Sequence, residues 1–209
     1  ENALGKATGS ARRLTSARLR ALYGLGSGLL IARLLVGLWQ LDPEGRPLIA
    51  LLTALARDPL LRASATVVLP AAVGTSLRWP AVATHLGLLF PERFSPKMLK
   101  SLAQNCASSW TQAGHLRGKI DKRRAVASPT PAAAAYAAAL ATLAGFGGPA
   151  LLEAPWMAVL DRPLEARLAL LRAAQARGLA RVRAAGDTVE IAVLQSMART
   201  IGVPELGDA

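Results

Sequence analysis

The stretch SPKMLKSLAQNCASSWTQAGHLRGKIDKRR, residues 95–124, contains a complete helix signal followed by a basic segment. Ser95 can cap the N-terminus through its hydroxyl, and Pro96 suits the first helical position, where its missing N–H needs no partner. Gly114 is a natural helix end, because glycine readily adopts the left-handed conformation. The stretch therefore predicts one long helix that runs to about Ala113, followed by a short basic hairpin or a loop.

The predicted helix has two chemically different faces, because its apolar residues recur at helical spacing. The apolar face consists of Leu99, Leu102, Ala103, Cys106, Trp110 and Ala113. The opposite face carries lysines, amides and hydroxyls, which are Lys97, Lys100, Ser101, Gln104, Asn105, Ser108 and Gln112.

Turn signals divide the preceding chain into further helices, expected at residues 27–40, 47–56, 60–73 and 79–89. A basic, partly ordered arm that leads into a helix comes first, and its charge is carried by Arg12, Arg13, Arg18 and Arg20. Helix, tight turn, helix, glycine and basic hairpin is the order of a winged helix-turn-helix.

The same order recurs downstream. Helices are expected at residues 131–144, 149–160 and 164–177, followed by a hairpin whose turn is Gly186-Asp187. The segment ASPTP, residues 127–131, is the expected boundary. The sequence thus predicts a mostly α protein with two winged helix-turn-helix-like units and short β-hairpins. The N-terminal helical region covers residues 1–128 and the C-terminal unit covers residues 129–209.

Composition narrows the class of protein. The chain has 209 residues, of which 52% are hydrophobic, so it can bury a core. Its net charge of +12 favours a polyanionic partner, either nucleic acid or an acidic membrane surface. A single cysteine excludes an internal disulfide and a cysteine-built zinc site, and it fits a reducing compartment. We therefore expect a cytoplasmic protein.

The best candidate for a membrane span is Leu25 to Leu41. It is short for a span and carries Arg33 in its middle, so we interpret it as a buried amphipathic helix and expect no integral membrane association. Peripheral membrane attachment through the arginine-rich N-terminus and the Leu25–Leu41 helix is a weaker alternative.

Signals for catalysis are weak. Cys106 lies on the apolar face of its helix, where a free cysteine usually behaves as a small hydrophobe. His85 and His115 do not form a metal-binding pattern, and no phosphate-binding loop or paired-carboxylate motif is present in the sequence. We predict no enzyme, no cofactor and no metal. His115 is expected to cap the helix C-terminus or, when protonated, to contact a phosphate.

If the partner is a polyanion such as nucleic acid, the polar face of the predicted helix and the basic segment after it are the parts expected to bind it. From Arg93 to Arg124 there are eight Lys or Arg residues and one acid, Asp121. Amides can pair with adenine, while lysines, arginines and hydroxyls mostly hold phosphates. The candidate nucleic-acid-binding residues are Lys97, Lys100, Ser101, Gln104, Asn105, Ser108, Gln112, His115, Arg117, Lys119, Lys122, Arg123 and Arg124.

Aromatic residues make up 4% of the chain, which argues against single-strand binding by stacked bases and favours double-stranded DNA. The tryptophans are expected in the core; they are Trp39, Trp79, Trp110 and Trp156.

Two segments carry a resemblance to a known family. LLTALARDPLLRASATVVLP, residues 51–70, and FSPKMLKSLAQNCASSWTQAGHL, residues 94–116, resemble the layout of the BrxA-type small proteins of BREX phage-defence systems. The matching positions are the capped helix from Ser95 and the step Gly114-His115-Leu116, and the alanine-rich C-terminal half departs from the pattern. The resemblance implies a non-enzymatic, mostly helical protein that binds double-stranded DNA within a bacterial defence complex.

Together these features predict a double-stranded DNA-binding accessory subunit, with protein partners in a complex and homo-oligomers possible. The alternative is a structural adaptor whose basic face docks an acidic protein.

Overall fold

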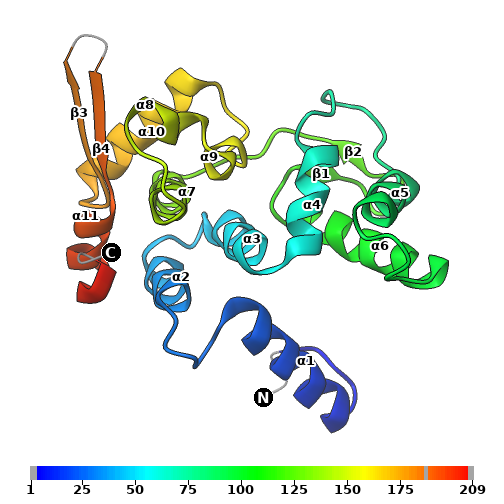
Figure 1. Ribbon diagram of the computed structural model, residues 1–209. Coiled ribbons are helices and arrows are strands. Elements are labelled where there is room, and N and C mark those ends of the chain that lie inside the picture. The colour runs from blue at the N-terminus through cyan, green and yellow to red at the C-terminus, as the bar shows by residue number, and fades with distance from the viewer. Residues whose placement is uncertain (1–3, 186–187, 207–209) are drawn as a thin grey trace.

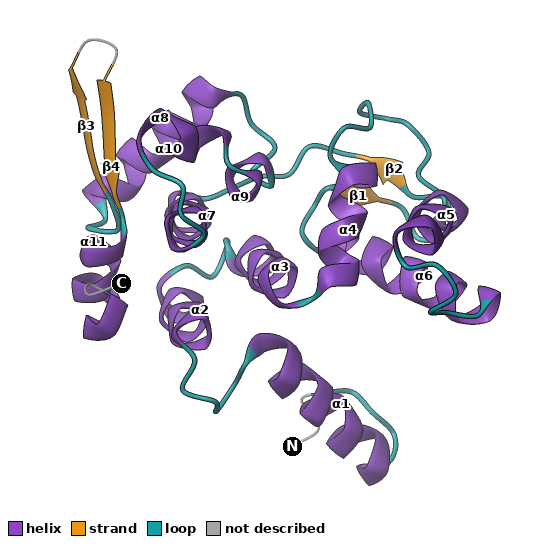
Figure 2. Cartoon of the chain, in the orientation of Figure 1, coloured by secondary structure: helices purple, strands orange, loops and turns teal. Residues whose placement is uncertain are grey.

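The computed structural model describes residues 4–185 and 188–206, and within these ranges the chain is mostly helical, as the sequence predicts (Figures 1 and 2). The longer helices are α1 (Gly9–Tyr23), α2 (Leu30–Leu41), α3 (Arg46–Arg57), α4 (Pro59–Val68), α5 (Trp79–Leu89), α6 (Pro96–Gln112), α7 (Pro131–Leu143) and α10 (Leu164–Ala176). The shorter ones are α8 (Gly148–Glu153), α9 (Pro155–Ala158), α11 (Leu194–Ile201) and a 3-10 turn, Pro204–Leu206. Two antiparallel hairpins pair β1 (Leu116–Arg117) with β2 (Arg123–Arg124) and β3 (Arg181–Ala185) with β4 (Thr188–Ala192).

Helix α7 lies at the centre of the molecule and packs against α3, α8, α9 and α10 (Figure 1). Every residue from Ala132 to Ala141 is buried, which is the pattern of a helix surrounded by protein on all sides. Alanine side chains suit this place because they let neighbouring helices approach closely. Tyr136 is the large exception, and its hydroxyl lies 2.8 Å from the hydroxyl of Thr53 on α3, so the buried polar atoms satisfy each other.

One hydrophobic cluster continues across the predicted boundary after residue 128. It includes Leu52 of α3, Trp110 of α6, Met157 of α9 and Leu171 of α10, all fully buried. The two halves therefore share a core, and the boundary coincides with the loop that leads into α7.

Helices α4, α5 and α6 pack together beside the β1–β2 hairpin, on the right of Figure 1. Trp110 of α6 is fully buried and donates from Nε1 to the hydroxyl of Ser64 on α4 at 2.7 Å. An extended segment joins the hairpin, because Ser76 forms a β-bridge with Arg123 and the N–H of Leu77 donates to the carbonyl of Lys122 at 2.7 Å.

The C-terminal region differs from the sequence prediction in two respects. The helix expected at residues 149–160 is broken into α8 and α9, because Pro155 has no N–H to continue the helical ladder and keeps Ala154 extended. Helix α11 follows the second hairpin and was not predicted. The predicted hairpin itself is present as β3 and β4, whereas its Gly186-Asp187 turn lies outside the described residues.

The tryptophan prediction is right for Trp110 and wrong for Trp39 and Trp79, which keep 42% and 37% of their surface exposed. Each exposed ring is instead covered by a cation. The guanidinium of Arg46 lies 5.4 Å from the centre of the Trp39 ring, and the Lys100 ammonium lies 5.2 Å from that of Trp79.

Candidate nucleic-acid interface

Helix α6 presents the polar face that the sequence predicts. Ser95 caps the helix by accepting the N–H of Met98 at 3.3 Å, and Pro96 occupies the first turn. Ala103, Cys106, Ala107 and Trp110 are buried against α4 and the core. The side exposed to solvent carries Lys97, Lys100, Ser101, Gln104, Asn105 and Ser108, which we call the α6 face.

The α6 face is positively charged and contains no carboxylate, because α6 has no Asp or Glu at all. Its cationic end is the N-terminal half, where Lys97 and Lys100 lie and where Lys100 also covers the Trp79 ring. The amides of Gln104 and Asn105 follow toward the middle of the helix. Gln112 is exposed but stands apart at the other end, where it lines a hollow together with Trp39 and Arg46.

The β1–β2 hairpin brings a second group of cations next to α6. Gly118 has a φ of 102°, and a side chain there would collide with the backbone carbonyl of Asp121, so the tight loop requires glycine. Arg117, Lys119 and Arg123 are exposed around this loop. Ile120 at its tip keeps 92% of its surface exposed, so the loop projects from the body of the protein.

Two of the predicted hairpin cations are partly engaged by the protein. Lys122 is half-buried and its ammonium donates to the hydroxyl of Thr111 at 2.8 Å. Arg123 lies 3.1 Å from the carboxylate of Asp121, which is 3.9 Å from Arg78 as well. A hydrogen bond from the Ser76 hydroxyl, together with these arginines, holds the pKa of Asp121 below its ordinary value. The hairpin therefore carries a local negative charge that the α6 face lacks.

His115 and Arg124 require a correction, because neither faces solvent. His115 is fully buried, with Nε2 at 2.8 Å from the carbonyl of Val159 and its ring edge-on to Trp110. Burial lowers the pKa of His115, so the ring is kept neutral, the opposite of what a phosphate contact needs. The side chain of Arg124 is 2% exposed. Neither residue is therefore part of the candidate interface.

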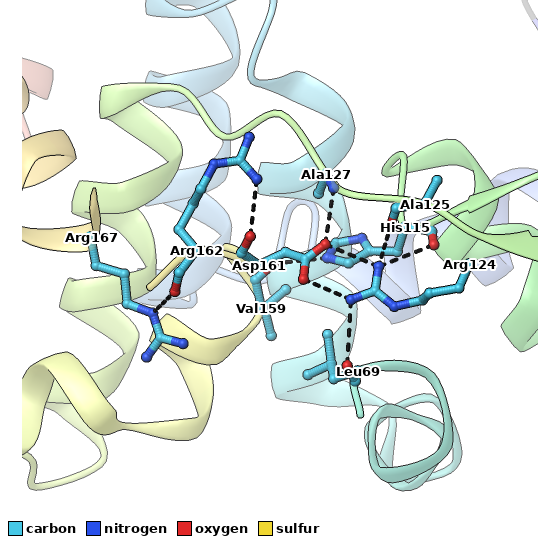
Figure 3. Close-up of polar contacts among 9 residues, drawn as sticks. All are labelled: Leu69, His115, Arg124, Ala125, Ala127, Val159, Asp161, Arg162 and Arg167. Atoms are coloured by element: carbon cyan, nitrogen blue, oxygen red, sulfur yellow. Dashed lines mark hydrogen bonds and ion pairs between the residues drawn. The ribbon is translucent and has the colours of Figure 1, made fainter. Parts of the chain in front are cut away.

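Arg124 instead forms a buried ion pair with Asp161 in the turn between α9 and α10 (Figure 3). Its two terminal nitrogens donate to the carboxylate at 2.6 Å and 3.0 Å, and further bonds reach the carbonyls of Leu69, His115 and Ala125. The same carboxylate accepts the N–H of Ala127 at 3.0 Å. Burial would raise the pKa of Asp161, but the hydrogen bonds from Arg124 and Ala127 outweigh it and hold that pKa below its ordinary value. This cluster ties the hairpin to the C-terminal half of the chain.

Sequence reasoning missed Asp161, Arg78 and Arg93. Arg78 and Arg93 are exposed on either side of α5, and Arg93 lies 5.4 Å from the ring centre of Phe94. Arg93 lies two residues before Ser95, the cap of α6, so its sequence position could have placed it at the N-terminal end of the α6 face. Nothing in the local sequence of Asp161 marks its partner, which lies 37 residues away.

The geometry around Cys106 gives no support to a role as a catalytic nucleophile. The thiol is buried on α6 with its sulfur 3.9 Å from the carbonyl of Leu60, so the predicted burial is confirmed. Burial raises the pKa of Cys106 to about 11, whereas a nucleophilic thiol needs a lowered pKa. His85 lies elsewhere, with Nε2 at 2.7 Å from the hydroxyl of Thr66. Among residues 4–185 and 188–206, no three His, Cys, Asp or Glu side chains gather as a metal site would require.

Comparison with known proteins returns no relatives: no family model, no curated protein and no solved structure matches the chain. Within the described part of the chain, no helix has both the length and the apolarity to cross a membrane.

Proposed function

We propose that the protein is a non-enzymatic double-stranded DNA-binding subunit that uses the α6 face and the hairpin cations Arg117, Lys119 and Arg123. The observation that carries the proposal is the α6 face itself, which is exposed, cationic and free of carboxylates over its whole length. DNA binding draws much of its affinity from neutralised phosphates, and a carboxylate on such a face would oppose it.

The order of elements supports this use of α6. Along the chain the order is helix α4, the extended residue Ser76, helices α5 and α6, and strands β1 and β2. In space, β2 lies between Ser76 and β1 and pairs with both. Winged helix-turn-helix proteins use this order, and they place the helix equivalent to α6 in the major groove. In that arrangement Gln104 and Asn105 would face base edges, whereas Lys97 and Lys100 would hold phosphates.

The hairpin would act as the wing. Its projecting loop and its position directly after α6 support contacts of Arg117 and Lys119 with the adjacent DNA backbone. Arg123 contributes less, because Asp121 already neutralises part of its charge.

The test is a salt titration of binding to a short duplex, which compares the parent with a Lys97→Ala/Lys100→Ala/Lys119→Ala variant. Each lost phosphate contact removes about 0.9 from the slope of log K against log salt, so three lost contacts lower it by about 2.7. These side chains are exposed, so the variant should keep its fold, whereas a change at Arg124 would remove a buried ion pair.

The matched control removes the same charge from the C-terminal half, as Arg172→Ala/Arg177→Ala/Arg181→Ala, all exposed positions. We expect the control to bind with nearly the parent's affinity and slope. Equal losses in the two variants would mean that net charge alone attracts the DNA, and no binding by the parent at moderate salt would reject the proposal.

The alternative function is an adaptor whose basic face docks an acidic protein, and the same titration separates the two because such an adaptor shows only weak attraction to the duplex. A setting within a bacterial phage-defence complex rests on the BrxA-type resemblance alone.

A further inference from the structure

Helices α1, α2 and α3 enclose an apolar groove that reaches Gln112 at the C-terminal end of α6 but is lined by none of the residues of the α6 face. Its central hollow has a volume of about 450 Å³ and walls that include Leu19, Tyr23, Leu25, Val36 and Trp39. An adjoining hollow shares Leu25 and Val36 and extends to Arg33, and another shares Tyr23 and Trp39 and extends to Arg46. We call this continuous feature the α1–α2 groove.

The groove exposes large apolar side chains side by side. Val36 keeps 48% of its surface exposed, Trp39 42% and Leu25 38%. Isolated exposed hydrophobes are normal on a protein surface, whereas adjoining ones that line a hollow indicate a binding surface.

Helix α1 forms one wall without being buried itself. None of its residues is fully buried, and its C-terminal end is held by Arg57, which donates to the carbonyls of Leu22 at 2.6 Å and Ala21 at 2.9 Å. The link to α2 turns through Gly24, Gly26 and Gly28, all with positive φ. A wall with few buried contacts can adjust to an occupant at small cost in free energy.

Most of the charge around the groove is positive. Between residues 4 and 41 the chain has no Asp or Glu, and its six cations are Lys6, Arg12, Arg13, Arg18, Arg20 and Arg33. Arg18 and Arg20 are exposed on either side of Leu19. Arg33 and Arg46 line the two ends, where Arg33 pairs with the exposed Glu205 at 2.7 Å and Arg46 donates to the carbonyl of Trp39.

We propose that the α1–α2 groove binds an acidic amphipathic helix of a protein partner. Apolar side chains at helical spacing would insert between Val36, Trp39 and Leu25, and carboxylates on the flanks would meet the arginines at the rim. A second copy of this chain is a poor occupant, because among the described α-helices only α8 and α10 contain an acid, Glu153 and Glu165 respectively. The inference does not depend on DNA binding, since it uses none of the residues of the α6 face.

The probe is a fluorescein-labelled synthetic peptide with leucines at helical spacing and glutamates between them, titrated with the full chain by fluorescence anisotropy. Val36→Asp places a carboxylate in the groove, and Leu25→Asp does so outside any helix, which guards against a folding defect in α2. The matched control is Leu88→Asp, since Leu88 on α5 is 76% exposed and distant in the chain. We expect both groove variants to bind the peptide at least about tenfold more weakly and the control to bind as the parent does.

Three outcomes would overturn the proposal. A scrambled peptide of the same composition that binds as tightly would reduce the interaction to non-specific charge attraction. The parent could instead fail to bind the peptide and sediment with vesicles of phosphatidylserine and phosphatidylcholine. If Val36→Asp abolished that sedimentation, the groove would be assigned to a membrane surface. A dimer of the parent that Val36→Asp dissociates would assign it to a second copy. Because Val36→Asp leaves the α6 face intact, duplex binding by this variant keeps the two proposals separate.

Discussion

Replacing Asp161 with Asn tests the buried ion pair that anchors the hairpin. Asparagine keeps the shape of the side chain and tolerates the positive φ of 58° at this position, so the change removes the charge with little backbone strain. Arg124 then remains as a buried cation with 2% of its side chain exposed and no carboxylate. Breaking one partner of a buried pair costs about 3–5 kcal/mol, and because Asp161 keeps 18% of its side chain exposed we expect a loss of about 2–3 kcal/mol.

The assay is equilibrium denaturation followed by circular dichroism and tryptophan fluorescence, supported by a melting curve. For a chain of this length the loss corresponds to a Tm lower by roughly 4–12 °C. Asp121→Asn is the matched control, because Asp121 makes the same kind of contact with Arg123 on the exposed hairpin and should change Tm very little. The reasoning is refuted if Asp161→Asn is as stable as the parent, or if both variants lose the same stability.

Three further predictions concern titratable groups that are buried or partly buried. Burial lowers the pKa of His115, so below about pH 6.5 the unfolded chain binds a proton at this residue and the folded chain does not. The stability of the protein should therefore fall as the pH drops below that value. The pKa of Asp161 is also lowered, so stability should fall again below about pH 4, as the pH falls toward the pKa of the folded state. Urea denaturations at a series of pH values would show both losses of stability. An unchanged urea midpoint between pH 7 and 5 would contradict the prediction for His115. Cys106 is buried and its pKa is raised to about 11, so at pH 8 it should react with a disulfide reagent on the order of a hundredfold more slowly in the native protein than in denaturant. The reaction is measured by release of the chromophoric thiol. Fast labelling of the native protein would contradict the burial of Cys106.

The helices were largely predictable because their ends carry strong local signals. Ser95-Pro96 marks the start of α6, and Asp58 caps α4 through its carboxylate, which accepts the N–H groups of Leu60 and Leu61. Helix α7 was predicted at residues 131–144, but its central position was not predicted. An alanine-rich helix shows no amphipathic stripe, so only the surrounding helices reveal that all its sides are covered.

Exposure within the candidate site was less predictable than helix position. Sequence spacing assigned the α6 face correctly, since alternating burial follows directly from helical geometry. It gave no means to separate Arg123 from Arg124, because adjacent residues in a strand point to opposite faces and the sequence alone does not say which face is inside. Arg124 is the residue that points inward, because it pairs with Asp161, which is distant in the chain. Arg123 stays at the surface.

The position of Arg124 also bears on how the proposed interface is built. Its main chain joins β2 to the segment before α5, since its N–H donates to the carbonyl of Thr75 at 2.9 Å and its carbonyl accepts the N–H of Gly74 at 2.8 Å. Its side chain joins the same strand to the C-terminal half through Asp161. The hairpin is therefore fixed at its base, while the loop that carries Lys119 projects from the body of the protein. If the protein binds DNA as proposed, the C-terminal half would contribute by holding the hairpin in place, without needing to contact the DNA.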